Sequence, residues 1–170
     1  PQEELVDHLY IASGRDYDLL LSEGFEGEIN EGSFKLLEDF CKDKGIDVFC
    51  ADPLANMTTS GETNEVFRTL AKRLSDLADS CGISIELVHH TRKGNGLDTN
   101  VESARGGSSL IAAVRSARVL SPMTKEEADK AGLESHVNHF RVEVGKSNLA
   151  RPLDKAMWFE KKSHALDNGD

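Results

Sequence analysis

Residues 83–93 read Ile-Ser-Ile-Glu-Leu-Val-His-His-Thr-Arg-Lys. An apolar run of β type ends abruptly in two histidines, a hydroxyl and two cations, and Gly94 follows. In an open α/β sheet, ligands bind at the carboxyl ends of the strands. This stretch therefore predicts a strand over residues 83–88 whose end carries a polar site.

The same layout occurs upstream, where the apolar residues 46–51 run directly into Asp52. A carboxylate after a buried strand has the form of a Walker B acid, which can hold Mg²⁺ directly or through water. An aspartate at a strand end can also do no more than cap a turn. Two strands that both end in polar side chains indicate a site more strongly than either strand alone.

The residues between these strands have helical spacing. Apolar residues recur at helical intervals from Val66 to Cys81, and Gly82 follows as the expected end of that helix. Ser33 is the expected cap of an earlier helix that ends at Gly45. The alternation of strand and helix in the first half predicts an α/β fold with a mostly parallel sheet flanked by helices.

The remaining elements follow from shorter patterns. Alternating apolar residues predict a strand over 137–145, and Thr124 with Glu127 has the spacing of a capping box for a helix that ends at Gly132. We expect the closing strands to be antiparallel. Other strands are predicted over residues 9–12, 117–120 and 155–160, loops over 22–32, 56–62 and 94–104, and a turn leading into a helix over 106–113.

Length and composition predict one domain with a buried core. The 170 residues carry a net charge of −10, and no apolar run approaches the roughly 20 residues of a membrane span. No signal peptide is visible, and Pro1 in place of a starting Met suggests a fragment or a processed chain. Cys41, Cys50 and Cys81 are far apart in the sequence and form no CxxC pair, which predicts reduced core thiols of a cytoplasmic protein.

The charge is unevenly distributed along the chain. Residues 1–88 carry seven basic and 19 acidic side chains, whereas residues 89–118 carry five basic and two acidic ones. An acidic body with one cationic segment is unlike a general nucleic-acid coat. It allows a local anion-binding strip that begins at the double histidine, although a solvated charged surface is the simpler interpretation.

His89 and His90 admit several roles. A neutral imidazole can polarise a phosphate or a water, bind a metal, or lie satisfied in the core. Adjacent residues of a strand point to opposite faces, so at most one ring should face a given ligand. This argues against joint chelation of one metal, and a histidine-based metallohydrolase stays as an alternative that stoichiometric metal would support.

Two further cationic motifs are candidates for phosphate binding. Residues 105–109 read Arg-Gly-Gly-Ser-Ser before an apolar helix, which is either an anion nest or an ordinary Gly-rich turn. Arg141 and Lys146 flank the end of a regular strand. They are either solvated or placed to stabilise phosphate charge across a subunit interface, as finger residues do in nucleotide hydrolases.

Taken in order, these motifs resemble those of the plasmid and phage RepA-type helicases, which are hexameric RecA-like P-loop ATPases related to the AAA families. The resemblance covers about residues 36–160 and is strongest in the His-His-Thr-Arg-Lys-Gly block. The motifs that carry it are Asp52-Pro53-Leu54 and residues 87–94, 104–110 and 144–148. It implies an ATP-dependent DNA helicase that uses ATP and Mg²⁺ and translocates on single-stranded DNA as a homo-oligomer, with no membrane partner.

The resemblance also implies a role for each motif. Asp52 corresponds to the Walker B acid that serves Mg²⁺, and one histidine, His90 in preference to His89, corresponds to the sensor of the γ-phosphate. Arg141 and Lys146 correspond to the finger pair that acts in trans. Asn148 occupies the position at which the resemblance places the second finger arginine. Arg141 or Arg151 would therefore have to take the place of that arginine in binding the nucleotide. The residues expected to contact DNA are Lys93, Arg105, Gly106, Gly107, Ser108 and Ser109.

One element of the family pattern is missing from the sequence. No G-x-x-x-x-G-K-[ST] motif occurs in the 170 residues, and the family places that loop and the catalytic Glu upstream. We therefore expect residues 1–170 to be a single partial RecA-like domain that lacks its N-terminal part and is inactive alone. The alternatives are a mobile-element DNA-processing ATPase without unwinding activity, and a non-catalytic oligomerising DNA-binding module.

Overall fold

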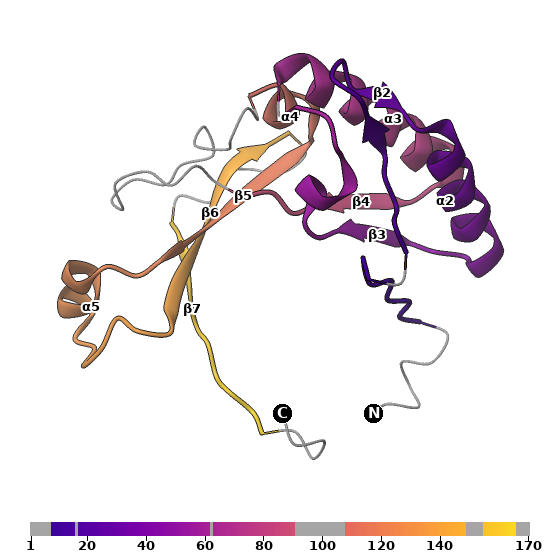
Figure 1. The fold of residues 1–170 in the computed structure, drawn as a ribbon. Coiled ribbons are helices and arrows are strands. Elements are labelled where there is room, and N and C mark those ends of the chain that lie inside the picture. The colour runs from indigo at the N-terminus through magenta and orange to yellow at the C-terminus, as the bar shows by residue number, and fades with distance from the viewer. Residues whose placement is uncertain (1–7, 16, 62, 91–107, 149–154, 166–170) are drawn as a thin grey trace. The chain divides into compact units, whose positions relative to one another are not determined.

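The computed structural model describes residues 8–15, 17–61, 63–90, 108–148 and 155–165 (Figure 1). Their contacts divide the chain into two compact units, an N-terminal unit of residues 1–90 and a C-terminal unit of residues 91–170. Each unit is described here by itself. The expectation of a single domain stays a prediction.

The N-terminal unit combines a small hairpin, two helices and a two-stranded parallel sheet. The hairpin strands β1 and β2 are antiparallel, and β3 pairs with β4 in parallel. A 3-10 turn over Leu54–Met57 follows β3. The bounds are β1 Ser22–Glu23, β2 Glu28–Ile29, α2 Glu31–Lys44, β3 Val48–Ala51, α3 Asn64–Cys81 and β4 Ser84–Leu87.

Local chemistry defines both ends of the two long helices. The side chain of Asn30 accepts a hydrogen bond from the Ser33 amide at the start of α2, and Thr63 does the same for Val66 at the start of α3. Gly45 and Gly82 end the two helices in the left-handed conformation, which glycine adopts without steric cost. Each helix therefore stops a few residues before the strand that it precedes.

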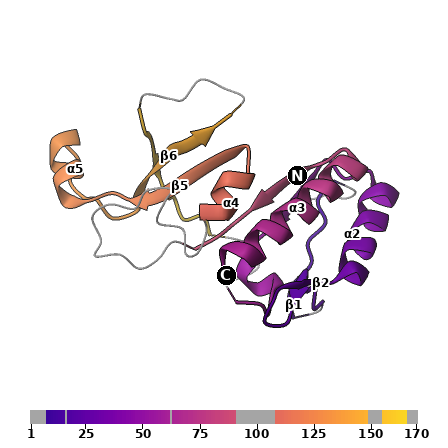
Figure 2. The same ribbon diagram turned by 90° about the horizontal axis from the view of Figure 1, so that it is seen from above.

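The core of the N-terminal unit lies where the facing sides of α2 and α3 meet, and the two helices run side by side in Figure 2. Arg73 of α3 reinforces this contact, because its guanidinium lies 2.9 Å from Glu31 and 4.5 Å from the centre of the Phe34 ring. The buried apolar side chains include Leu21, Phe34, Leu37, Ala51, Leu54, Val66, Phe67, Leu70, Leu74 and Leu77.

The β1–β2 hairpin approaches α3 closely at one glycine. A Cβ atom on Gly27 would lie 2.6 Å from Cγ2 of Val66, and the φ of Gly27 is +76°. Both the backbone conformation and the available space therefore require glycine at this position. The hairpin can rest on the helix only because residue 27 has no side chain.

The C-terminal unit is built on an antiparallel sheet in the order β5-β6-β7. β5 and β6 form a long ribbon with a register shift at Ala117 and Arg118, and α5 connects them (Figure 1). Thr124 and Glu127 form the predicted capping box of α5. The bounds are α4 Ser108–Ala113, β5 Ser116–Pro122, α5 Lys125–Ala131, β6 His139–Ser147 and β7 Met157–Glu160.

The α/β class and most predicted elements are confirmed, and five expectations are wrong. Residues 9–12 form no strand. The segment 22–32, which was predicted to be a loop, contains β1, β2 and the start of α2. The residue that caps α2 is Asn30 and not Ser33. The sheet is not mostly parallel, because the described strands form three separate sheets and only β3 and β4 pair in parallel. Cys50 is exposed and is not a core residue. Two-residue strands are too short to leave an alternating pattern in the sequence.

The helix contact gives a first testable prediction. Leu70→Ala should lower the free energy of unfolding of the N-terminal unit by about 2–5 kcal/mol, because the fully buried side chain leaves a cavity. Leu36→Ala, at a leucine on α2 that is 45% exposed, is the matched control and should cost less than about 1 kcal/mol. Urea unfolding followed by circular dichroism measures both, and equal losses would contradict this description of the core.

Candidate functional site: the carboxyl ends of β3 and β4

The parallel pairing of β3 and β4 brings the predicted polar residues to one edge. The register runs from Val48 opposite Ser84 to Ala51 opposite Leu87. It continues one step further, because the Val88 amide donates to the carbonyl oxygen of Ala51 at 2.9 Å. Asp52 therefore lies level with Val88, and the two histidines follow directly in the chain.

The two histidines have different surroundings. The His89 ring is half-buried and meets the Phe67 ring of α3 edge to face, with 5.4 Å between the ring centres. His90 is exposed. Strand alternation places His90 on the opposite face from His89. His89 is therefore a packing residue of the N-terminal unit, and His90 is the histidine that a ligand can reach.

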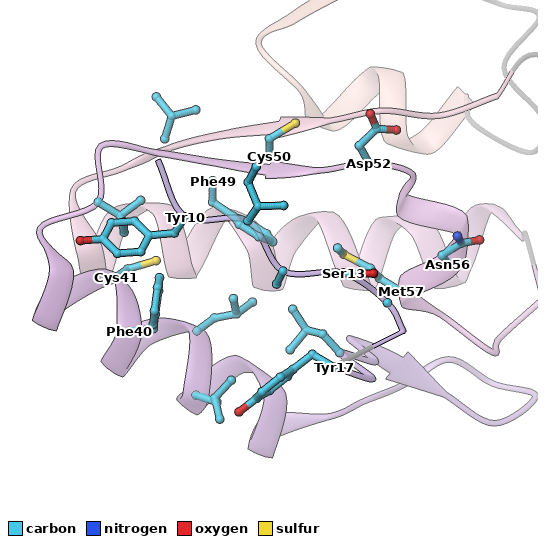
Figure 3. Close-up of a pocket in the computed structure, with 18 of the residues that line it drawn as sticks. Tyr10, Ser13, Tyr17, Phe40, Cys41, Phe49, Cys50, Asp52, Asn56 and Met57 are labelled. Atoms are coloured by element: carbon cyan, nitrogen blue, oxygen red, sulfur yellow. The ribbon is translucent and has the colours of Figure 1, made fainter. Parts of the chain in front are cut away.

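Asp52 and His90 share a face of the sheet. Figure 3 shows Cys50 and Asp52 pointing to one side of β3 and Phe49 to the other. Since β3 and β4 are in register, alternation gives Val88 and His90 the same side as Asp52. An exposed carboxylate and an exposed imidazole thus lie at the ends of neighbouring strands, which is where α/β sheets bind ligands.

The donor chemistry at this edge suits Mg²⁺ bound together with a phosphate. Mg²⁺ keeps several waters and takes one or two protein carboxylates plus phosphate oxygens, and Asp52 is one such carboxylate. A metal held by protein groups alone is not indicated. Among the described residues, no group of three or more His, Cys, Asp or Glu side chains gathers in an arrangement that could hold a metal ion.

The segment after Asp52 is anchored by interactions that the sequence did not predict. The Leu54 amide donates to the Val88 carbonyl oxygen at 2.9 Å, which ties the 3-10 turn to the end of β4. The buried Ser22 hydroxyl lies 2.6 Å from the Thr58 hydroxyl, and the Thr59 amide donates to the Ser22 carbonyl oxygen. These partners are more than 30 residues apart in the chain, and no local pattern marks them.

A wide groove opens beside the candidate site within the N-terminal unit. Its volume is about 1700 Å³, and Figure 3 shows part of its lining. Asp52 and Asn56 lie toward one end of the drawn lining, and Tyr10, Phe40 and Cys41 lie toward the other. Many of its side chains are apolar, including Leu36, Phe40 and Val48, and such a surface does not bind phosphate. Because Asp52 is one of the lining residues, the groove adjoins the polar site at one end.

Arg141 has partners inside the C-terminal unit. Its side chain on β6 forms an ion pair with Glu127 of α5, and its Nε lies 3.2 Å from Glu143. Its guanidinium also lies over the ring of Trp158 on β7, 5.9 Å from the ring centre. The side chain is only 15% exposed. These contacts give Arg141 a structural role in joining α5 to the sheet, and a role in trans stays a prediction.

Lys146 caps a helix in the same unit. Its ammonium donates to the carbonyl oxygens of Ile111 and Ala112 at 2.8 Å and 2.7 Å. These carbonyls belong to the last turn of α4, where a cation also interacts favourably with the helix dipole. The Asn148 amide donates to the Arg115 carbonyl oxygen, which holds the end of β6 near the start of β5. A finger role for Lys146 requires these bonds to break, and it stays a prediction.

Several predicted site residues lie outside the described residues. Of the expected DNA-binding set, the structure describes the backbone of Ser108, which begins α4, and the half-buried Ser109. The contacts of the others are not described. The predicted residues outside the described ranges are Lys93, Arg105, Gly106, Gly107 and Arg151.

The different surroundings of the two histidines can be tested by paired substitutions. His89→Ala removes the ring contact with Phe67 and should destabilise the N-terminal unit by about 1–2 kcal/mol. His90→Ala removes an exposed side chain and should change stability by less than about 0.5 kcal/mol. Urea unfolding compares the two variants directly, and the reverse order of stabilities would show that the faces are assigned wrongly.

The Arg141 contacts predict a fluorescence change in the C-terminal unit. Arg141→Lys keeps the charge but loses the planar group that serves two carboxylates and stacks on Trp158, so it should destabilise this unit by about 1–2 kcal/mol. Trp158 is the only tryptophan in the sequence, and its emission reports the change. Lys162→Ala, which breaks an exposed pair with Glu160, is the control and should leave stability and emission nearly unchanged.

Two general comparisons complete the description of the chain. In the described ranges, every helix is too short or too polar to cross a bilayer. No protein-family model matches the sequence. The functional argument therefore depends on the chemistry at the ends of β3 and β4.

Proposed function

We propose that this chain is part of the ATPase motor of a DNA helicase of the RepA type, which couples ATP hydrolysis to movement along single-stranded DNA. One observation carries the proposal. Asp52 and His90, which lie 38 positions apart in the sequence, both follow the carboxyl ends of two paired parallel strands, and the register brings Asp52 level with Val88, two residues before His90. A motor that senses the state of a bound nucleotide needs a carboxylate and a hydrogen-bonding group in this arrangement.

Asp52 serves the nucleotide through its charge. Its carboxylate is exposed, and the backbone on either side of it is fixed by hydrogen bonds to β4. Mg²⁺ bound with ATP would neutralise the charge that develops on the phosphates. Asp52 would hold the metal in position at the strand end, directly or through water. The carboxylate needs no movement to do so, because β3 already presents it.

His90 connects the nucleotide site to the next segment of the chain. Its imidazole can hydrogen-bond a phosphate oxygen that is held near Asp52. Residues 91–107 follow His90 directly and contain Arg92, Lys93 and Arg105. A change at His90 when the γ-phosphate leaves would therefore act on the start of a cationic segment. This is how hydrolysis would alter contacts with DNA phosphates.

The phosphate-cradling loop has to come from residues outside these 170. The β3–β4 pair has room for it, because a two-stranded parallel sheet is an incomplete layer and Val48 and Val88 are partly exposed on it. A strand added in parallel beside either partner would place its following loop at the same edge as Asp52 and His90. Such a strand would also bury apolar surface that the described residues leave open.

The distribution of charge is consistent with a DNA-binding role for the second half of the chain. Residues 1–90 carry seven basic and 19 acidic side chains, whereas residues 91–170 carry 13 basic and 11 acidic ones. Binding to a phosphate backbone requires local positive charge. The second half of the chain, with its basic residues, is therefore better suited to contact DNA than the acidic N-terminal unit.

A non-catalytic DNA-binding module is the second candidate. It is favoured by the partners of Arg141 and Lys146, since both expected finger residues are engaged within their own unit. In a module of this kind, Arg141 and Lys146 would have only a structural role. Retained binding of single-stranded DNA without any ATP hydrolysis by the complete protein would favour this candidate.

The ATPase proposal predicts a specific loss of activity. In a polypeptide that joins these residues to a P-loop, Asp52→Asn should lower DNA-stimulated ATP hydrolysis at least about 100-fold, because the amide has no charge for Mg²⁺. His90→Ala should reduce turnover while nucleotide affinity remains. The 170 residues alone should show neither tight ATP binding nor hydrolysis. A coupled-enzyme assay and equilibrium dialysis measure these quantities.

Asp47→Asn is the matched control. Asp47 is also an exposed aspartate beside β3, but it lies at the amino end of the strand. Its substitution should leave hydrolysis within about twofold of the parent, because the amino ends of the strands do not bind the nucleotide. Normal turnover by the isolated chain or by Asp52→Asn would contradict the proposal, as would equal losses in the two aspartate variants.

A further inference from the structure

The last turns of α2 and α3 bring two cysteines together. Cys41 is 4% exposed, and Cys81 is half-buried at the last residue of α3. The Cys81 sulfur lies 3.9 Å from the carbonyl oxygen of Glu38. Glu38 stands three residues before Cys41, so the two share one side of α2. The Cys81 thiol therefore lies against the turn of α2 that carries Cys41.

The two thiols interact with each other. Burial raises the pKa of the Cys41 thiol, and the charge and hydrogen bonding of Cys81 add to this effect. The ammonium of Lys42 forms an ion pair with Glu38 in the same turn of α2. Its pKa is raised mainly by its bond to Glu38, and the charge of Cys81 contributes. Cys81 thus presents a partly exposed sulfur against the turn of α2 that carries the buried Cys41.

We propose that Cys41 and Cys81 are a redox modification site, at which a small-molecule disulfide such as oxidised glutathione converts the two thiols into an intramolecular disulfide. The proposal is independent of the proposed ATPase function. It depends on the partly exposed Cys81, on the buried Cys41, and on the packing of α2 against α3, which places the Cys81 sulfur 3.9 Å from the Glu38 carbonyl oxygen in the turn of α2 that carries Cys41.

The chemistry proceeds in two exchange steps. The Cys81 thiolate attacks one sulfur of oxidised glutathione, which forms a mixed disulfide and releases one glutathione thiolate. The Cys41 thiol then loses its proton, and its sulfur attacks the Cys81 sulfur, which releases the second glutathione. Two protein thiols are oxidised, and one glutathione disulfide is reduced to two glutathione thiols. The protein sulfurs have to close to about 2.05 Å for the bond to form.

The disulfide would link the ends of the two helices that precede β3 and β4, the strands that lead to the candidate site. α2 passes through Gly45 to β3 and Asp52, and α3 passes through Gly82 to β4 and His90. The bond would close a loop through residues 42–80 and would hold together the amino ends of the two strands. Closing a loop of this length stabilises the folded state by restricting the unfolded chain. Oxidation would therefore stiffen the scaffold beneath Asp52 and His90 without touching either residue.

The test uses the 170-residue chain with Cys50→Ser, which removes the exposed third thiol. Incubation with oxidised glutathione under native conditions should lower the intact mass by two hydrogens and leave no titratable thiol. Peptide mapping should find residues 41 and 81 in one linked pair. The melting temperature should rise on the order of 5 °C and return to its original value after reduction.

Two further variants establish the order of events. In the Cys50→Ser background, Cys41→Ala should stop the reaction at the mixed disulfide on Cys81, and Cys81→Ser should leave the buried Cys41 unmodified. A chain that keeps a glutathionyl group on Cys81 while Cys41 stays a free thiol would overturn the proposal. So would the absence of any reaction under conditions that modify Cys50 in the unsubstituted chain, or a reaction that needs denaturant.

Discussion

The parallel hydrogen-bonded ladder between β3 and β4 is the constraint on which the rest of the N-terminal unit depends. Its register sets which residues leave the sheet together at the carboxyl edge, and the bonds from Val88 to Ala51 and from Leu54 to Val88 extend it past the regular strands. A slip of one residue would exchange the faces of all the side chains on one strand. His90 would then point away from Asp52, and His89 would lose its contact with Phe67.

The sequence predicted the parts of this unit that have local signals. α3, β3 and β4 were expected from apolar spacing and from the polar residues at the strand ends, and Gly45 and Gly82 marked the helix ends. Other features come from pairings between distant residues. The Ser22–Thr58 contact and the approach of Cys81 to α2 depend on tertiary packing, and no pattern within a short window indicates them. Residues 9–12 have the composition of a strand, but they form none in the structure.

The candidate site shows the same division between local and distant information. Strand alternation in the sequence predicted that the two histidines point to opposite faces. The contact with Phe67 in the structure then showed that His89 is the one that points inward. The cations of the C-terminal unit show how a motif can be ambiguous. Arg141 and Lys146 were expected to act as finger residues, and in the structure the first holds α5 to the sheet and the second caps α4. A sequence does not show whether a cation already has a partner in its own fold.

The close approach of Gly27 to Val66 has a consequence for how this sequence can diverge. Position 27 is constrained twice, by a φ of +76° that most side chains avoid and by a valine methyl that occupies the space of a Cβ. A smaller residue at 66 relieves only the second constraint. Compensating substitutions in α3 therefore cannot free position 27, and the hairpin should keep this glycine while its exposed neighbours Phe25 and Glu26 drift. In diverged relatives of this chain, overall sequence identity can be too low to show that the hairpin is preserved. A glycine aligned with residue 27 would still indicate the hairpin in such a relative.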